Sequence, residues 1–274
     1  MVVAGTFCKG AVAIKRYKAK KDANTIIDEL RIMRHVRHPN IALFHGAVLS
    51  SGADDILLVL ERIRGMELSN VVMKLGAWMP SSPNKEAQTS VMLQVCQALI
   101  YLHTRENSIV HADVKPDNIM VIKQGGGLCP KLLDFGLARR ATYRARQTSA
   151  GTPAYMAPET LQPGHKASCA GDVYAMGLLL FFTASGRRPL ARYKPTEIVQ
   201  VLRAGEVPGL AWSPDTELLS KWKDTILLCT KVDPSQRLVA EQVYDSIAAS
   251  DGRRKSVADS KCPGTTPRQT VASL

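Results

Sequence analysis

Apolar positions at the start of the chain follow the two-residue period of β-strands, with one helical segment among them. Cys8, Lys9 and Gly10 predict a hairpin turn between the first two strands. Between residues 22 and 36 apolar residues recur every three to four positions and charged residues fill the other face, which predicts a helix that Pro39 stops shortly afterwards. Strands are predicted over residues 2–7, 11–17, 41–48 and 56–60. The N-terminal part is therefore expected to be a small β-rich unit with one helix.

Beyond Gly65 the pattern becomes mainly helical. Residues 86–103 place apolar side chains on one face of a long helix, which is expected to lie in the core. A second hairpin is predicted from residues 119–122 and 131–133, closed by the three glycines 125–127. Helical patterns punctuated by proline and glycine then continue to residue 250.

No segment of the sequence predicts a membrane span or a secretory signal. The longest apolar run, residues 173–184, is too short for a membrane helix and contains Gly177, so it predicts a buried helix. The first seven residues have no basic start before an apolar run. After residue 250 the composition shifts to Gly, Pro, Ser, Thr and Arg, which predicts a disordered basic tail over residues 251–274. The protein is expected to be soluble and cytoplasmic.

The composition permits a large core but does not select a function. The 274 residues are 45% hydrophobic and 22% charged, with a formal net charge of +12 that would favour an anionic partner. The basic residues are spread over several segments and no nucleic-acid motif is present, so no nucleic-acid partner is expected. The six cysteines form no CxxC pair, which argues against a zinc ribbon or a thioredoxin-type site.

Several short motifs, in one order, carry the chemistry. Residues 12–15 read VAIK, residues 111–118 read HADVKPDN, residues 134–136 read DFG and residues 157–159 read APE. Together with Glu29 in the predicted helix, they resemble the signature set of protein kinases. Each would be weak alone, because a lone DFG, a strand lysine or a helix glutamate is usually an ordinary surface feature. The resemblance covers residues 2–250.

The resemblance implies an α+β, bilobal protein-kinase fold and a role for each charged residue. Asp113 would accept or orient the proton of the attacking hydroxyl, and Lys115 would bring a fixed positive charge to the transferring phosphate. Lys15, held by an ion pair with Glu29, would bind the inner phosphates of ATP. The expected domain is residues 1–250, with an N-lobe of about residues 1–62 and a C-lobe of about residues 63–250.

The resemblance also implies a nucleotide site with a divalent cation. Asn118 and Asp134 offer the hard oxygen ligands that Mg²⁺ accepts, with Mn²⁺ as an alternative. Leu60 would be the gatekeeper, residues 61–63 would be the hinge that meets adenine, and Val2, Ala13 and Met120 would sandwich the ring. The residues expected around the nucleotide are Val2, Ala13, Lys15, Leu60, Glu61, Ile63, Met120 and Asp134.

Other residues match supporting positions of the family. Asp172 is expected to brace the backbone of the catalytic loop, and Arg237 is expected to pair with Glu159. His111 is expected to pack as a core histidine against Phe135. Met33 and Phe44 are expected to be core residues next to the Lys15–Glu29 pair.

The substrate class is predicted from two places. Lys115 and the GTPAYM segment at residues 151–156 resemble serine/threonine kinases. Residues 5–7, 37–41 and 44–46 look most like the tyrosine-kinase-like group that includes Raf and mixed-lineage enzymes. The expected activity is therefore transfer of the γ-phosphate of ATP to serine or threonine of a protein substrate, with the oligomeric state left open.

Two departures from the family pattern affect these expectations. Gly5 and Gly10 lie too close to Lys15 to form the glycine-rich loop over the phosphates, so the sequence is interpreted as truncated before that loop. Weakened nucleotide binding leaves a pseudokinase or scaffold as the alternative. Ala112 replaces the arginine that most regulated kinases carry, which makes obligate activation by phosphorylation less expected. The candidate phosphosites are Thr142, Thr148 and Ser149.

Overall fold

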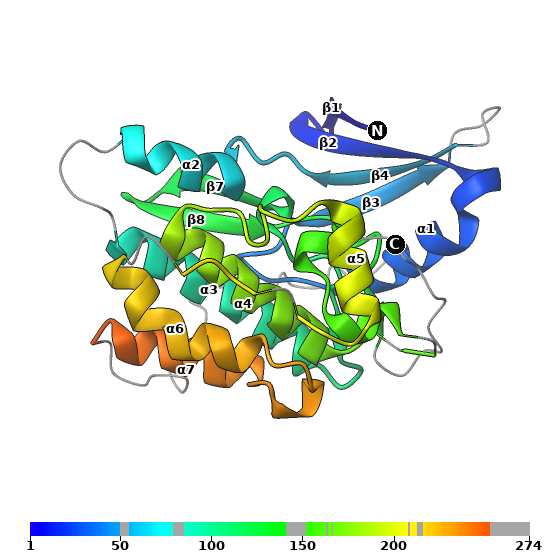
Figure 1. Ribbon diagram of the computed structural model, residues 1–274. Helices are drawn as coiled ribbons and strands as arrows, with labels where there is room; N and C mark the ends of the chain where they lie inside the picture. Colours follow the sequence, from blue (N-terminus) through cyan, green and yellow to red (C-terminus); the bar gives the residue numbers. More distant parts are fainter. Residues whose placement is uncertain are drawn as a thin grey trace, which may run out of the picture.

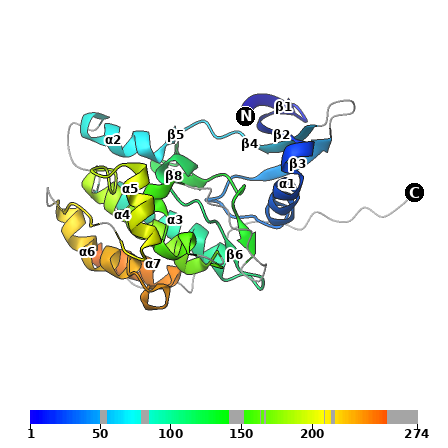
Figure 2. The ribbon, with the colours of Figure 1, turned by 45° about the vertical axis from the view of Figure 1, so that its right-hand side comes forward.

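The chain forms a small sheet with one helix, joined to a larger, mainly helical part. The computed structural model describes residues 1–49, 55–78, 85–140, 152–162, 164–165, 167–207, 209–212 and 216–252. Figure 1 shows the N-terminal strands and α1 on one side and the bundle of α3, α4, α6 and α7 on the other, and the turned view in Figure 2 shows the same division. The predicted α+β, two-lobed fold is confirmed.

The N-terminal sheet has four antiparallel strands in the order β1-β2-β4-β3. A two-residue turn of Cys8 and Lys9, with φ of 48° and 64°, joins the first two strands. Gly10, predicted as part of this turn, is instead the first residue of the second strand and pairs with Phe7. The strands are β1 (Val2–Phe7), β2 (Gly10–Lys18), β3 (Phe44–Leu49) and β4 (Asp55–Glu61).

The single helix of this part, α1 (Ala19–Met33), begins and ends three residues before its predicted bounds. The strand predicted over residues 41–48 also begins later than expected. Ile41 makes an isolated parallel bridge to Leu132, and the Ala42 amide donates to Leu132 O at 3.0 Å. These residues therefore tie the sheet to the second part of the molecule instead of extending β3.

A three-stranded sheet in the order β5-β7-β8 carries the second hairpin. Gly125 and Gly126, with φ of 58° and 78°, form the turn, and Gly127 already belongs to the following strand. Pro130 lies opposite Val121 in the edge strand, where proline is tolerated. The elements here are β5 (Met66–Glu67), α2 (Leu68–Trp78), β7 (Ile119–Gln124) and β8 (Gly127–Leu132).

The helical part packs around α4, whose residues 172–184 are all buried. At Gly177 an added Cβ would lie 2.6 Å from Cys229 Cβ, so the absence of a side chain allows α4 and α6 to approach closely. None of the helices in the described residues is long and apolar enough to cross a membrane. The helices are α3 (Lys85–His103), α4 (Cys169–Ser185), α5 (Pro195–Arg203), α6 (Glu217–Cys229) and α7 (Ala240–Ser250).

Short elements complete the fold. The two-stranded ladder of β6 (Ile109–Val110) and β9 (Arg139–Arg140) flanks the loops that carry the sequence motifs. Asp251 and Gly252, predicted as the start of the tail, form a turn after α7, and the rest of the predicted tail lies outside the described residues. Single 3-10 turns occur at Pro116–Asn118, Pro153–Tyr155, Pro158–Leu161 and Pro234–Gln236.

Candidate active site

Lys15 connects the N-terminal sheet, α1 and the DFG motif. Its Nζ lies 2.9 Å from Glu29 Oε1 and 2.7 Å from Asp134 Oδ1, while the Glu29 side chain is only 1% exposed. Burial alone would lower the pKa of Lys15, but the carboxylates of Glu29 and Asp134 outweigh burial and raise the pKa above its usual value. Burial alone would raise the pKa of Asp134, but the Lys15 ammonium outweighs it and lowers the pKa. Lys15 and Asp134 therefore stay charged near neutral pH.

Tyr17 is a member of this cluster that sequence reasoning missed. Its hydroxyl donates to Glu29 Oε2, and the Lys15 Nζ lies 5.0 Å from the centroid of its ring. Burial, followed by the hydrogen bond to Glu29, raises the pKa of Tyr17. The sequence did offer one indication that Tyr17 lies near Lys15. Side chains two residues apart on a strand point to the same face, and Tyr17 is two residues after Lys15.

The catalytic loop holds one carboxylate in a fixed position. Asp113 Oδ2 accepts from Lys115 Nζ at 2.7 Å and from Asn118 Nδ2 at 2.7 Å, and Asn118 Nδ2 also donates to Asp113 O at 2.8 Å. Among the described residues, no hydrogen-bond donor reaches Asp113 Oδ1. This oxygen can therefore accept the proton of an incoming hydroxyl.

Thr152, which the sequence analysis did not single out as a site residue, extends the loop's contacts. Lys115 Nζ donates to Thr152 Oγ1 at 3.0 Å, across 37 positions of sequence. The side chain of Lys115 therefore links the catalytic loop to the segment that leads into the APE motif.

Asp172, on the first turn of α4, fixes the backbone of the catalytic loop as expected. Its Oδ2 accepts from the His111 amide at 2.8 Å, and its Oδ1 accepts from the Ala112 amide at 2.8 Å. His103 Nε2 is 2.9 Å from Oδ2, a contact that the sequence did not indicate. Ala112 has φ of 63°, a left-handed conformation that is costly for a residue with a Cβ and that these bonds help to hold.

His111 is confirmed as a packing residue. Its ring lies 4.9 Å from the Phe135 ring in an edge-to-face arrangement, and both residues are fully buried. His111 Nε2 lies 2.8 Å from Leu133 O and Nδ1 lies 3.3 Å from the Asp113 amide, which assigns the proton to Nε2. Met33 and Phe44 are likewise buried in the main core.

Two oxygen atoms at the site fit a divalent cation. Asn118 uses its Nδ2 to bind Asp113, which leaves its Oδ1 without a partner among the described residues. Asp134 directs its Oδ1 to Lys15 and to the Gly136 amide, and no described residue donates to its Oδ2. The described residues contain no cluster of three or more His, Cys, Asp or Glu side chains that could hold a metal by itself. One carboxylate and one amide oxygen suit Mg²⁺, which keeps several other ligands as water or phosphate.

The residues expected around the adenine lie on the strands and linker next to this cluster. Val2 pairs with Lys15 and Ala13 pairs with Leu60, so the sheet places these four side chains close together. Met120 lies on β7 opposite Glu67. Their contacts with a nucleotide remain predictions.

Of the predicted hinge residues, Glu61 uses its side chain elsewhere. The carboxylate lies 2.9 Å from Lys131 Nζ and accepts from the Leu43 amide at 3.0 Å. Its backbone amide donates to Leu43 O at 2.7 Å. Contacts of the Glu61 carbonyl and of the Ile63 backbone with adenine remain predictions.

The APE motif is anchored by the predicted ion pair. Arg237 NH1 and NH2 lie 2.6 Å and 2.7 Å from the two carboxylate oxygens of Glu159, and the Arg237 side chain is 0% exposed. The same guanidinium donates to backbone carbonyls of Ala170, Lys231 and Val232.

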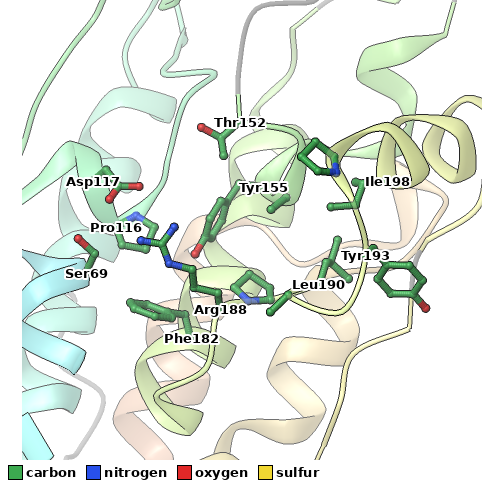
Figure 3. Close-up of a pocket in the computed structure, with 14 residues that line it drawn as sticks. Ser69, Pro116, Asp117, Thr152, Tyr155, Phe182, Arg188, Leu190, Tyr193 and Ile198 are labelled. Carbon is green, nitrogen blue, oxygen red and sulfur yellow. The ribbon is translucent and has the colours of Figure 1, made fainter.

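A pocket of about 160 Å³ opens beside the catalytic loop. Figure 3 shows Asp117 and Pro116 of that loop on one side of it, with Arg188 and Tyr155 nearby. Thr152, the partner of Lys115, also lines the pocket. The remaining walls are largely apolar and come mainly from α4, α5 and the segment between them.

The model of the protein kinase domain matches residues 7–247. The chain belongs to the protein kinase family. This kinase chain is 32% identical to the serine/threonine-protein kinase ATG1b of Arabidopsis thaliana over 234 residues, which are 85% of the chain and 31% of that protein.

Two other relatives from the same plant support the serine/threonine class. The serine/threonine-protein kinase CTR1 is 34% identical over 180 residues, covering 64% of this chain and 21% of that protein. The mitogen-activated protein kinase kinase kinase ANP1 is 31% identical over 232 residues, covering 82% of this chain and 32% of that protein. The kinase chain thus spans a third or less of the length of these relatives.

The structure gathers the predicted site residues of the kinase into two groups. Lys15, Glu29 and Asp134 form one group, and Asp113, Lys115 and Asn118 form another. The candidate phosphosites Thr142, Thr148 and Ser149 lie outside the described residues.

Proposed function

We propose that the chain transfers the γ-phosphate of ATP to serine or threonine hydroxyls of protein substrates. The observation that carries this proposal is the carboxylate of Asp113. Its Oδ2 is held by Lys115 and Asn118, while its Oδ1 is left without a donor from the described residues. That arrangement suits a group that orients a hydroxyl and accepts its proton.

The other charged residues serve the phosphates. Lys15, kept cationic by Glu29 and Asp134, would bind inner phosphate oxygens of ATP. Lys115 sits next to Asp113 and would offset charge that develops on the transferred group. Mg²⁺, or alternatively Mn²⁺, would be held by Asn118 and Asp134 and would neutralise phosphate charge. The residues therefore act mainly by positioning and by electrostatics.

The pocket of Figure 3 supports a protein substrate. It adjoins Asp117, and its Thr152 contacts Lys115, so a side chain that flanks the accepting hydroxyl can enter it. Its largely apolar walls favour an apolar flanking residue.

Within the family, we propose membership of the tyrosine-kinase-like group. The segments at residues 5–7, 37–41 and 44–46 support this assignment. The domain is proposed to cover residues 1–250, with the lobes meeting at the linker after Glu61. Cytoplasmic localisation is part of the same proposal.

Transfer of labelled phosphate from ATP to a basic protein tests the activity. Asp113→Asn and Asp134→Asn should each lower the rate by at least about a hundredfold, because each removes a charge at the reacting centre. Asp28→Asn, on the surface of α1 beside Glu29, is the matched control and should keep the wild-type rate. Binding of ATP without transfer by the wild-type chain would favour the pseudokinase alternative.

A further inference from the structure

A second, larger pocket lies on the linker that joins β4 to β5. Residues 62–66, Val71, residues 121–123 and Leu128 line it, and we call it the linker pocket. Its volume of about 650 Å³ falls within the range of sites that bind ligands.

The linker backbone separates this pocket from the position expected for adenine. A Cβ at Gly65 would lie 2.3 Å from Val121 O and 2.8 Å from Ile122 Cγ2, so the linker rests directly on β7. Met120 and Ile122 share one face of β7 because side chains alternate along a strand. Met120 belongs to the predicted adenine site, whereas Ile122 lines the linker pocket and lies against Gly65.

The linker pocket combines an apolar floor with a basic rim. Ile122 and Leu128 are half-buried in it, whereas Arg62, Arg64 and Lys123 are exposed at its edge. No acidic residue is among the described residues that line the pocket. A ligand that fits must therefore supply both an apolar group and negative charge.

We propose that the linker pocket binds an acidic segment of a partner protein, with one aliphatic side chain on the floor and carboxylates facing the rim. Charge complementarity favours this occupant, since the rim is wholly cationic and the chain has a formal charge of +12. The described lining contains no aromatic side chain on which a nucleic-acid base could stack, which disfavours RNA or DNA. The binding does not depend on the proposed kinase activity.

Fluorescence anisotropy without nucleotide tests the proposal. The probe is a short labelled peptide with glutamates on both sides of one leucine. Arg62→Glu combined with Arg64→Glu should weaken its binding about tenfold or more, because attraction at the rim becomes repulsion. Arg203→Glu combined with Lys231→Glu changes the net charge equally at exposed sites on α5 and after α6, and should bind like the wild type.

Changes in the peptide measure the contributions of the floor and of the rim to binding separately, without altering the protein. Replacing the glutamates by glutamine, or the leucine by serine, should each weaken binding to the wild-type chain several-fold. These peptides test the proposed binding on the wild-type chain, so the test holds even if thermal unfolding shows that a protein variant is misfolded. Equal binding of the leucine and serine peptides, equal loss in both protein variants, or tighter binding of single-stranded RNA would each overturn the proposal.

Discussion

At Tyr17 a single hydroxyl holds the carboxylate that pairs with Lys15. Glu29 is buried and offers one oxygen to Lys15 and the other to Tyr17. Each oxygen of a buried carboxylate needs a donor, because leaving one without a partner costs about 1–3 kcal/mol. We therefore expect Tyr17 to be a positioning residue that would act on the proposed phosphate binding of Lys15 through Glu29.

Replacing Tyr17 by phenylalanine tests this role while keeping the ring. We expect kcat/KM for ATP to fall about tenfold, mainly through a higher KM, because Glu29 and Lys15 lose their fixed geometry while Asp113 is untouched. Steady-state kinetics with varied ATP measures the split. Tyr244→Phe, on α7, is the control, since no described residue is hydrogen-bonded to its hydroxyl. Wild-type kcat/KM in Tyr17→Phe would contradict the role.

Residues that belong to the kinase motifs could be predicted from the sequence. Residues that only support them through contacts in the folded chain could not. Lys15, Asp113 and Asp134 stand in recognisable motifs, and the predicted ion pair of Lys15 with Glu29 is present in the structure. Tyr17 and His103 lack a motif, and their contacts with Glu29 and Asp172 span 12 and 69 positions of sequence. Only the folded chain reveals such pairs.

Among the elements, the loop after α1 is fixed to α3 through a histidine. The ring of His38 packs on Tyr101 at 5.1 Å, and His38 Nδ1 accepts from the Asn40 amide at 3.1 Å. Burial, with a contribution from Lys131, lowers the pKa of His38 to about 4. The junction is therefore built around a neutral imidazole.

This junction makes stability depend on pH. The unfolded chain protonates His38 near its usual pKa of about 6.5, whereas the folded chain does so only near 4. The unfolded state thus binds more protons between these values, and the free energy of unfolding falls as pH falls through this window. Between pH 7 and 5 we expect a loss of about 1 kcal/mol from this residue, after allowing for its partial exposure.

Urea denaturation at pH 7 and pH 5 measures this loss. His38→Phe keeps an aromatic ring on Tyr101 and should show a smaller loss than the wild type. His45→Gln replaces an exposed histidine of β3 and should show the same loss of unfolding free energy as the wild type. An identical loss in His38→Phe would assign the pH dependence to other groups.

Element types were predictable, whereas their ends often were not. The start of α1 has no side-chain cap, so the sequence offers no signal at Ala19. β8 was predicted too short because Pro130 and the glycines weaken a strand pattern, yet the edge position tolerates proline. Residues 127–132 form a strand because they pair with β7 in the folded chain.

At the scale of the whole molecule, Arg237 ties distant segments together. Its guanidinium binds Glu159 of the APE motif, the Ala170 carbonyl in the first turn of α4 and two carbonyls that follow α6. It also lies 5.0 Å from the ring of Tyr174. These contacts fix the end of the motif-bearing segment to the helical core.

Arg237→Ala should lower the free energy of unfolding by about 3–5 kcal/mol, because it leaves the Glu159 carboxylate without its cation. For a domain of this size the melting temperature should fall by about 10 °C. Differential scanning calorimetry checks this. Lys85→Ala removes one side of an exposed pair with Glu217 and should change the melting temperature by at most about 3 °C. Similar shifts for both variants would show that the Arg237 pair contributes no more than a surface contact.

The linker between β4 and β5 contributes backbone to both the predicted adenine site and the linker pocket. Ile63 belongs both to the predicted adenine site and to the lining of the linker pocket. Thermodynamic linkage then requires reciprocity. Whatever factor an acidic segment imposes on the affinity for ATP, ATP must impose on the affinity for that segment, so a single titration from either side measures how strongly the two sites communicate.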